Sequence, residues 1–310
     1  MASVTAGEIG ATRRVVTRAS RGEKARGFAF QAALLIAVGL GLLSLAVLIF
    51  TVIRDGAGSL SPDFLTNQAS RINPDKAGVA SALRGTLWLM ALCVLFIVPV
   101  GVATAIYLEE YADGTRWWNR LIEVNIQNLA AVPSVVYGIL GLAFIVRADP
   151  VGLSVGPVLL AGALTLGLLV LPVVIIVARE AIRAVPPSIR EGSLALGATQ
   201  WQTIWKQVLP GALPGIATGV ILALSRAIGE TAPLIVIGAA LFARFNPEFW
   251  DLFWDDSRFT ALPLQILTYI SDPSEEFRSL GAATILVLLG LLVIMNSVAI
   301  VLRNRYEQKW

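Results

Sequence analysis

The chain has 310 residues, of which 56% are hydrophobic and 15% charged, and its mean hydropathy is +0.75. Soluble domains carry about 25% charged residues, so this composition predicts an integral membrane protein. The net charge of +3 argues against nucleic-acid binding as the main role. With no histidine and a single cysteine, Cys93, the sequence offers no metal cluster, cysteine–histidine pair or intrachain disulfide.

Six runs are long enough to span a membrane, because a hydrocarbon core of about 30 Å needs about 20 apolar residues of helix. They are continuously apolar and lack the period-two alternation of a membrane barrel, so we expect an all-α protein with six transmembrane helices. Prolines 99, 133 and 172 lie inside these runs, and Gly138, Gly141, Gly162 and Gly167 permit close helix contacts. The runs are 28–53, 84–108, 124–146, 155–178, 211–241 and 281–302.

Basic residues predict the orientation. If the N-terminus is cytoplasmic, the inner segments hold fifteen Lys and Arg and the outer segments eight, so we expect both termini in the cytoplasm. Segment 1–27 is then a basic cytoplasmic tail, 28–79 the first transmembrane helix with an outer loop, and 303–310 a second cytoplasmic tail. A cleaved signal peptide is the rival interpretation of the first run, but an h-region is shorter.

The longest inner loop carries helix start and stop signals. Ser188 and Glu191 stand as S-x-x-E after two prolines, which predicts a capping box. Gly197 is suited to a left-handed helix end, and Thr199 with Gln202 offers a second capping box. We therefore expect two short helices joined near residue 197.

In the second of these helices, Trp201, Ile204, Trp205 and Val208 recur at helical spacing and make one apolar stripe. Two tryptophans on one face are typical of a docking surface for a partner. The alternative is a surface helix that packs on its own protein.

Two charged residues interrupt the fifth run. Arg226 and Glu230 are four residues apart, hence on one face of a continuous helix. Because a charge at the bilayer centre costs at least ~2.5 kcal/mol, both side chains should face the bundle interior or a water-filled path. The arginine fork is suited to an oxyanion, and Glu230 could orient the guanidinium or accept a proton from the substrate. A mutual structural ion pair is the alternative.

Several segments resemble a known family. EGSLALGATQWQTIWKQVLP, with Glu191, Gly197 and Leu209-Pro210 in place, resembles the EAA loop of type I ABC importer permeases, the MetI-like family, although Gly192 and another small residue replace its two alanines. More narrowly, AIYLEEYA, AAVPSVVYGILGL, SRAIGETAP and FTALPLQIL resemble the PstA family of phosphate-specific permeases. The resemblance runs from about residue 84 to the end, so 80–302 would form the permease core, with its loop at about 188–210.

The resemblance implies partners and site residues. Such a permease works in the plasma membrane with a second, PstC-like permease, two PstB-like ATPases and an extracytoplasmic PstS-like phosphate-binding protein. The substrate pathway would include Arg226, Glu230 and Arg179, although Arg179 also fits the topology rule as an anchor at an inner helix end. The ATPase-coupling residues would be Glu191, Gly197, Trp201, Ile204, Leu209 and Pro210.

The chain lacks a G-x-x-x-x-G-K-[ST] motif, so we expect no enzymatic activity and no cofactor of its own, with ATP bound by the partner subunits. The resulting mechanism is alternating access. The outer segment 242–277, rich in aromatics and acids, is expected to be a partly helical interfacial insert that meets the binding protein, or an aromatic belt. Other functions are a permease for molybdate or sulfate, an ion-coupled secondary transporter, for which an internal repeat would be needed, and a membrane-embedded enzyme.

Overall fold

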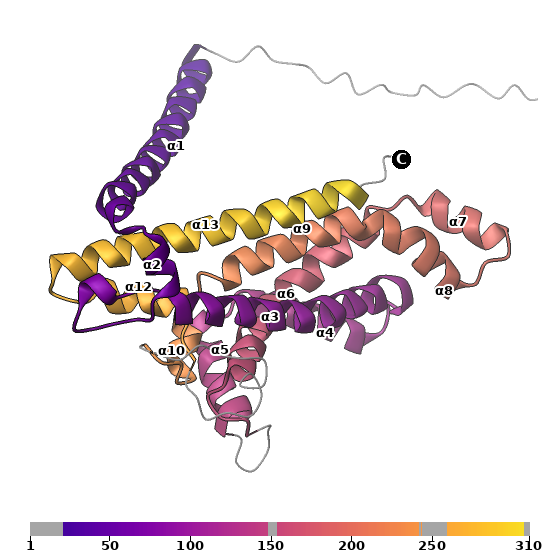
Figure 1. Ribbon diagram of the computed structural model, residues 1–310. Coiled ribbons are helices and arrows are strands. Elements are labelled where there is room, and N and C mark those ends of the chain that lie inside the picture. Colours follow the sequence, from indigo (N-terminus) through magenta and orange to yellow (C-terminus); the bar gives the residue numbers. More distant parts are fainter. Residues whose placement is uncertain (1–20, 148–153, 242, 244–258, 307–310) are drawn as a thin grey trace, which may run out of the picture. The chain divides into compact units, whose positions relative to one another are not determined.

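The computed structural model describes residues 21–147, 154–241, 243 and 259–306, and every regular element in these ranges is a helix (Figure 1). The chain divides into two units, Met1–Thr51 and Val52–Trp310. Helix α1, Arg21–Gly56, fills the described part of the first unit and reaches into the second. Its apolar side chains from residue 28 to 50 are exposed, as expected of a helix that faces lipid, and the predicted span 28–53 is confirmed.

Four long helices form the centre of the second unit. They pack in the order α3, α6, α9 and α13. The predicted spans 84–108 and 281–302 are confirmed by the apolar helices Ala80–Tyr111 and Glu275–Arg305, and 155–178 is confirmed from Leu159 onward. The helices approach closely because glycine lies at the contacts: a Cβ at Gly167 would stand 2.6 Å from the Phe96 ring, and one at Gly101 2.8 Å from Val174. Their bounds are Ala80–Ile106 (α3), Leu159–Arg183 (α6), Leu209–Ala227 (α9) and Glu275–Tyr306 (α13).

The predicted single helix 124–146 is wrong. α4, Trp117–Ala130, ends before Pro133, and α5, Ser134–Gly141, continues through the π-helical turn η4, Leu142–Arg147, after a bend of 107°. The cause is local, because a proline has no N–H to donate and the residue before it disfavours the α conformation.

The predicted helix 211–241 is also interrupted. α9 ends at Ala227, and the short helix α10, Ala232–Val236, begins only after a four-residue break. Gly229 lies in the break, and Pro233 cannot donate the N–H that a continuous helix would require there. Arg226 therefore lies in the last turn of α9, and Glu230 lies in the break.

The outer segments pack together. Phe64, in α2 (Pro62–Thr66), is buried in a cluster with Tyr269 and Phe277, whose rings stack at 5.9 Å, and the Tyr269 hydroxyl donates to Gly78 O at 2.9 Å. Burial raises the pKa of Tyr269 to about 12. The other outer elements are η1, Ala57–Ser59, η2, Pro74–Lys76, and α12, Leu262–Ile270.

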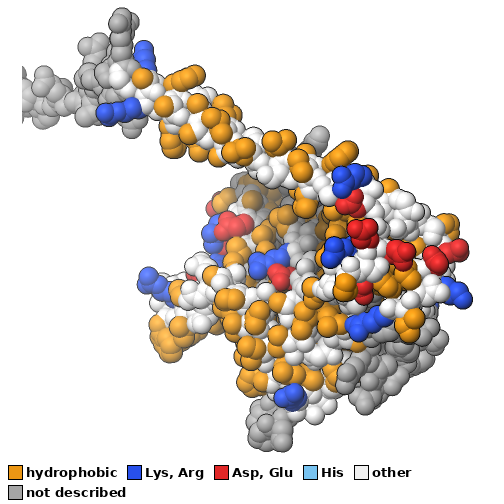
Figure 2. All heavy atoms as spheres, turned by 90° about the vertical axis from the view of Figure 1, so that its left-hand side faces the viewer, with side chains coloured by type: hydrophobic (Ala, Val, Ile, Leu, Met, Phe, Trp, Pro, Cys, Tyr) orange, Lys and Arg blue, Asp and Glu red, His pale blue; other side chains and the backbone are white. Residues whose placement is uncertain are grey.

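The inner elements gather at the opposite end of the long helices (Figure 1). Among the described residues, five helices are long and apolar enough to cross a membrane, and the bent α4–α5 pair makes six if it counts as one span. Hydrophobic side chains accordingly cover much of the surface in Figure 2. The inner elements are η3, Tyr107–Tyr111, α7, Pro187–Ala195, α8, Gln200–Thr203, and η5, Ile204–Val208.

Candidate functional site

The two broken spans meet. α5 packs on α10, and a Cβ at Gly138 would stand 2.9 Å from both Pro233 Cα and Val236 Cβ, so only glycine permits this approach. Irregular backbone at membrane depth is tolerated where it is buried in protein or lines a water-filled cavity. Paired helix breaks are also where transporters hold ionic substrates. This junction is therefore the best candidate for a translocation site.

Arg226 lies in the last turn of α9, beside the break. Its Nε is 3.5 Å from Glu230 Oε1, and the two side chains are 44% and 22% exposed. The mutual ion pair that the sequence left as the alternative thus forms, but not on one helical face, because α9 ends at Ala227 and Glu230 belongs to the break. A cation is favoured at the position of Arg226 by the dipole of the helix C-terminus.

Helix packing gives the depth of Arg226. α6 and α9 are antiparallel, with Gly215 against Ala181 and Gly219 against Val177. The same register places Arg226 level with residue 170, near the midpoint of α6. On the other side of α9, the hydroxyl of Ser225 donates to Asn296 Oδ1 of α13 at 2.9 Å. Arg226 is therefore near the middle of the bundle's length.

Arg179 lies elsewhere. Its Nη1 donates to Glu123 Oε1 at 2.9 Å, its Nε is 3.5 Å from Glu109 Oε2, and its side chain is 14% exposed. It stands nine residues along the α6–α9 register from Arg226, which corresponds to ~13 Å along the helix axis. The structure thus places the two arginines at different depths, and Arg179 is already balanced by two carboxylates.

The first capping box is wrong. α7 has Pro186 as N-cap and begins at Pro187, and no side chain caps it. Proline's fixed φ starts the helix one residue before Ser188, so the Ser188 hydroxyl lies past the N-cap position. Glu191 is exposed and forms no hydrogen bond or ion pair within the described part of the chain.

The remaining loop signals are confirmed. Gly197 has φ +85°, and the N–H groups of Gly197 and Ala198 donate to the carbonyls of Leu194 and Ser193, which is a Schellman ending of α7. Residues Thr199 and Gln202 form the second capping box, with both reciprocal bonds present. Two short helices therefore meet near residue 197.

The predicted apolar stripe is divided. Trp201 and Trp205 are at least half exposed, and their rings meet edge to face at 5.4 Å. Ile204 and Val208 are each 1% exposed, because the π-helical turn η5 rotates them into the protein, so they attach the helix to its own subunit. The docking prediction is thus wrong for Ile204 as a surface residue. Beside the tryptophans lies a groove of about 390 Å³, lined by Ser188, Ile189, Gly192, Ser193, Leu196, Ala198, Gln202, Lys206 and Gln207.

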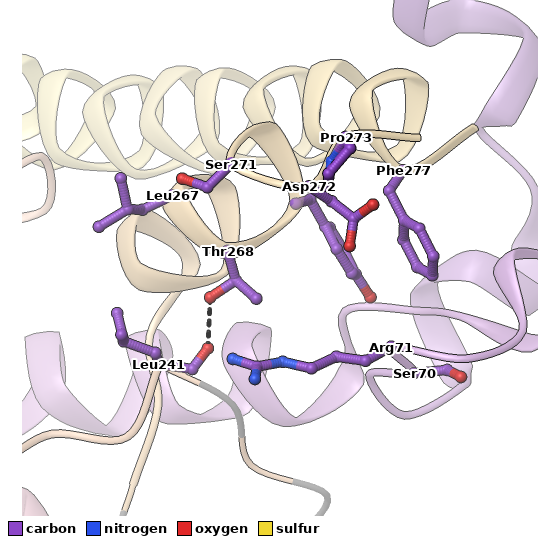
Figure 3. A pocket seen from close by; sticks show the side chains of 10 residues that line it. Ser70, Arg71, Leu241, Leu267, Thr268, Ser271, Asp272, Pro273 and Phe277 are labelled. Carbon is purple, nitrogen blue, oxygen red and sulfur yellow. Dashed lines mark hydrogen bonds between the residues drawn. The ribbon is translucent and has the colours of Figure 1, made fainter. Parts of the chain in front are cut away.

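A second cavity, of about 340 Å³, lies on the outer side next to α12. Figure 3 shows the Arg71 side chain extending toward Leu241 and Thr268, with Asp272 on the far wall. This region belongs to the predicted outer insert 242–277. Residues 242 and 244–258 of that insert lie outside the described residues, and its described part is helical, with Tyr269 buried in the outer cluster.

Sequence reasoning missed the polar contact at Asn296 and the ion pairs of Glu109 and Glu110. Asn296 could have been found, because a lone amide in an apolar run marks an interhelical contact. Glu110 pairs with Arg190, eighty residues away, and no periodicity reports a contact at that separation.

Comparison with known proteins places these features in context. Residues 97–308 match the family described as "Binding-protein-dependent transport system inner membrane component". The probable ABC transporter permease protein YqgI of Bacillus subtilis (strain 168) is 32% identical over 230 residues, 74% of each chain. The phosphate transport system permease protein PstA of Xylella fastidiosa (strain Temecula1) is 32% identical over 277 residues, 87% of this chain and 90% of the relative.

A solved structure shares the fold. The chain of a bacterial ABC transporter involved in the import of the acidic polysaccharide alginate superposes with a TM-score of 0.64 at 16% identity, over 90% of this chain and 96% of the other.

Proposed function

Because this chain belongs to the family of binding-protein-dependent transport system inner membrane components, we propose that it is a permease subunit of an ATP-driven importer of inorganic phosphate. The observation that carries the proposal is the Arg226–Glu230 pair at a helix break, at mid-depth in a multi-pass bundle. Relatives that cover most of the chain carry phosphate transport in their names.

The chemistry of the pair suits phosphate. A guanidinium offers a planar fork of N–H donors to two oxygens of an oxyanion. Phosphate at neutral pH still carries a proton, which it can donate to a carboxylate such as Glu230, whereas sulfate carries none. One cation and one acid bind weakly enough to permit exit, as conduction requires. We propose Arg179 as a second, weaker contact nearer the cytoplasm, since an anion there must displace a carboxylate.

In this proposal, movement of the inner loop drives the change of access at Arg226. Glu191 and the exposed Trp201 and Trp205 form the surface that we propose an ATPase subunit holds, while Gly197 sets the angle between α7 and α8. η5 leads directly into α9 at Leu209-Pro210, so movement of the loop reaches the Arg226 end of α9 through continuous helix. ATP is bound and hydrolysed by the partners in this scheme.

Exposure of Arg226 suggests where the path lies. A guanidinium that is 44% exposed near mid-bundle would be costly against lipid, so another subunit must cover it. We propose that a second permease of PstC type does so, with two PstB-like ATPases below and a PstS-like binding protein on the outer face. Both termini are cytoplasmic in this arrangement.

The proposal is tested by reconstituting the complete complex in proteoliposomes. We expect ATP-dependent accumulation of labelled phosphate that unlabelled phosphate suppresses and that equal molybdate or sulfate does not. Suppression by molybdate or sulfate would assign the permease to another oxyanion. Accumulation that follows an ion gradient and needs no ATPase would instead identify a secondary transporter.

A further inference from the structure

Glu110 links the inner loop helices to a transmembrane helix to which they are not covalently joined. The chain connects α7 and α8 to α6 on one side and to α9 on the other. Glu110 lies in η3, the π-helical turn that ends α3. Any contact between Glu110 and the loop helices therefore adds a third attachment point, on α3.

Glu110 forms an ion pair with α7. Arg190 of α7 donates from Nε and Nη2 to Glu110 Oε1, at 3.1 and 2.9 Å. The same guanidinium donates to Val185 O at 2.6 Å and to Ile182 O at 2.7 Å. Residue 186, the α-helical partner of the Ile182 carbonyl, is a proline with no N–H. That carbonyl accepts the N–H of Val185 at 3.3 Å instead, and Arg190 adds a second donor.

α8 contacts the same residue. The Gln200 side chain donates from Nε2 to the main-chain oxygen of Glu110 at 2.6 Å. The side chain of Glu110 thus holds α7 and its carbonyl holds α8. With only 10% of the Glu110 side chain and 21% of Arg190 exposed, water screens the pair weakly, and loss of one partner would leave the other charge poorly solvated.

The neighbouring carboxylate has different partners. Glu109 accepts two bonds from Arg183, at 2.9 and 3.0 Å, and lies 3.5 Å from Arg179, both on α6. The π-helical turn places these adjacent acids on separate partners, one on α6 and one on the loop helices. Among the described residues, Glu109 therefore pairs only with α6 and does not touch α7 or α8.

We propose that Glu110 and Arg190, with Gln200, form a latch that makes α3 move with the loop helices when the ATPase moves them. The proposal rests on the proposed function as an ATP-driven permease. Without the latch, loop movement would reach α6 and α9, but the loop helices would move relative to α3. The contact between α3 and α6 lies at the centre of the bundle. These residues are positioning residues, and their expected effect is on coupling.

Two measurements on the complete complex test the latch. In proteoliposomes, Glu110→Ala should raise the ATP hydrolysed per phosphate imported about fivefold, the lower end of site-to-site coupling. Asp113→Ala, which removes an exposed acid paired with Arg116 in the same inner segment, should stay near wild type. Gln200→Ala, which keeps the ion pair, should fall between them. Co-purification of the ATPase with Glu110→Ala shows that the variant assembles. If it does not assemble, the same measurement is made with Glu110→Gln, which keeps the shape of the side chain.

The second measurement needs ATP but no cargo. Spin labels on Tyr107→Cys in η3 and Ser188→Cys in α7, both exposed, are placed in a Cys93→Ala background. The distance between the labels should not change with ATP in the otherwise native chain and should change with Glu110→Ala. A distance that already changes with ATP in the native chain, or equal uncoupling by Asp113→Ala, overturns the latch. If the distances behave as expected but wild type imports no phosphate, only the proposed cargo fails.

Discussion

Arg226 lies in the last turn of its helix, one residue before the helix ends. The C-terminal dipole favours the guanidinium there, and Glu230 approaches it from the break, so neither group depends on the other's helix geometry. Such a pair can open to admit an anion without the loss of a helical turn. This is the residue-scale basis of the transport proposal.

Substitution of the two arginines should have unequal effects. Arg226→Gln removes charge-assisted hydrogen bonds to phosphate, each typically ~1.5–3 kcal/mol, so uptake should fall by about tenfold or more. Arg179→Gln should lower uptake less, because Glu109 and Glu123 already neutralise that guanidinium. Initial rates of phosphate uptake in reconstituted complexes measure both. Normal uptake by Arg226→Gln would return the pair to a purely structural role.

Charge reversal on the loop should act on the partner subunit. Glu191→Lys places a cation on the exposed face of α7, and we expect the ATPase to dissociate and uptake to stop. Glu276→Lys, an equally exposed acid at the start of α13, provides the control and should leave ATPase binding unchanged. Affinity purification through a tag on the permease reports binding directly. Retention of the ATPase by Glu191→Lys would disprove the docking assignment.

At the scale of elements, the long helices could be predicted and the breaks could not. Hydropathy averaged over about 20 residues locates spans such as α6, but it does not register that Pro133 and Pro233 end helices rather than kink them. The prolines break the helices locally, but the contact at which the two breaks meet, between α5 and α10 at Gly138, is tertiary and has no signal in hydropathy. Likewise, helical spacing predicted Ile204 on an outer face, and a π-helical turn moved it inward.

The loop caps give a matched pair of substitutions. Thr199→Ala removes a side-chain cap from α8, which costs ~1 kcal/mol, so amide exchange in α8 and η5 should accelerate about fivefold. Ser188→Ala removes a hydroxyl that caps nothing and should leave exchange in α7 unchanged. Hydrogen–deuterium exchange resolved by peptide checks both. Equal acceleration by the two variants would mean that the caps do not control loop stability.

At the scale of the whole molecule, the site residues are positioned by contacts that span the chain. α9 carries Arg226, Asn296 of α13 accepts a hydrogen bond from the neighbouring Ser225, and α6 and α3 complete the bundle. The sequence supported the pathway residue and the exposed loop because both are local patterns. It was silent on Glu110 and Arg190, which are brought together only by the fold.

Alternating access at Arg226 has one direct test. Gly229 is exposed beside the pair, and a Cβ there would meet no atom closer than 3.8 Å, so Gly229→Cys in a Cys93→Ala chain introduces a reporter without a clash. A charged, membrane-impermeant thiol reagent is applied to either face of the reconstituted complex, with and without trapped ATP. We predict that ATP transfers labelling from one face to the other. Labelling from the same face in both states, or only by a lipid-soluble reagent, would contradict alternating access at Arg226.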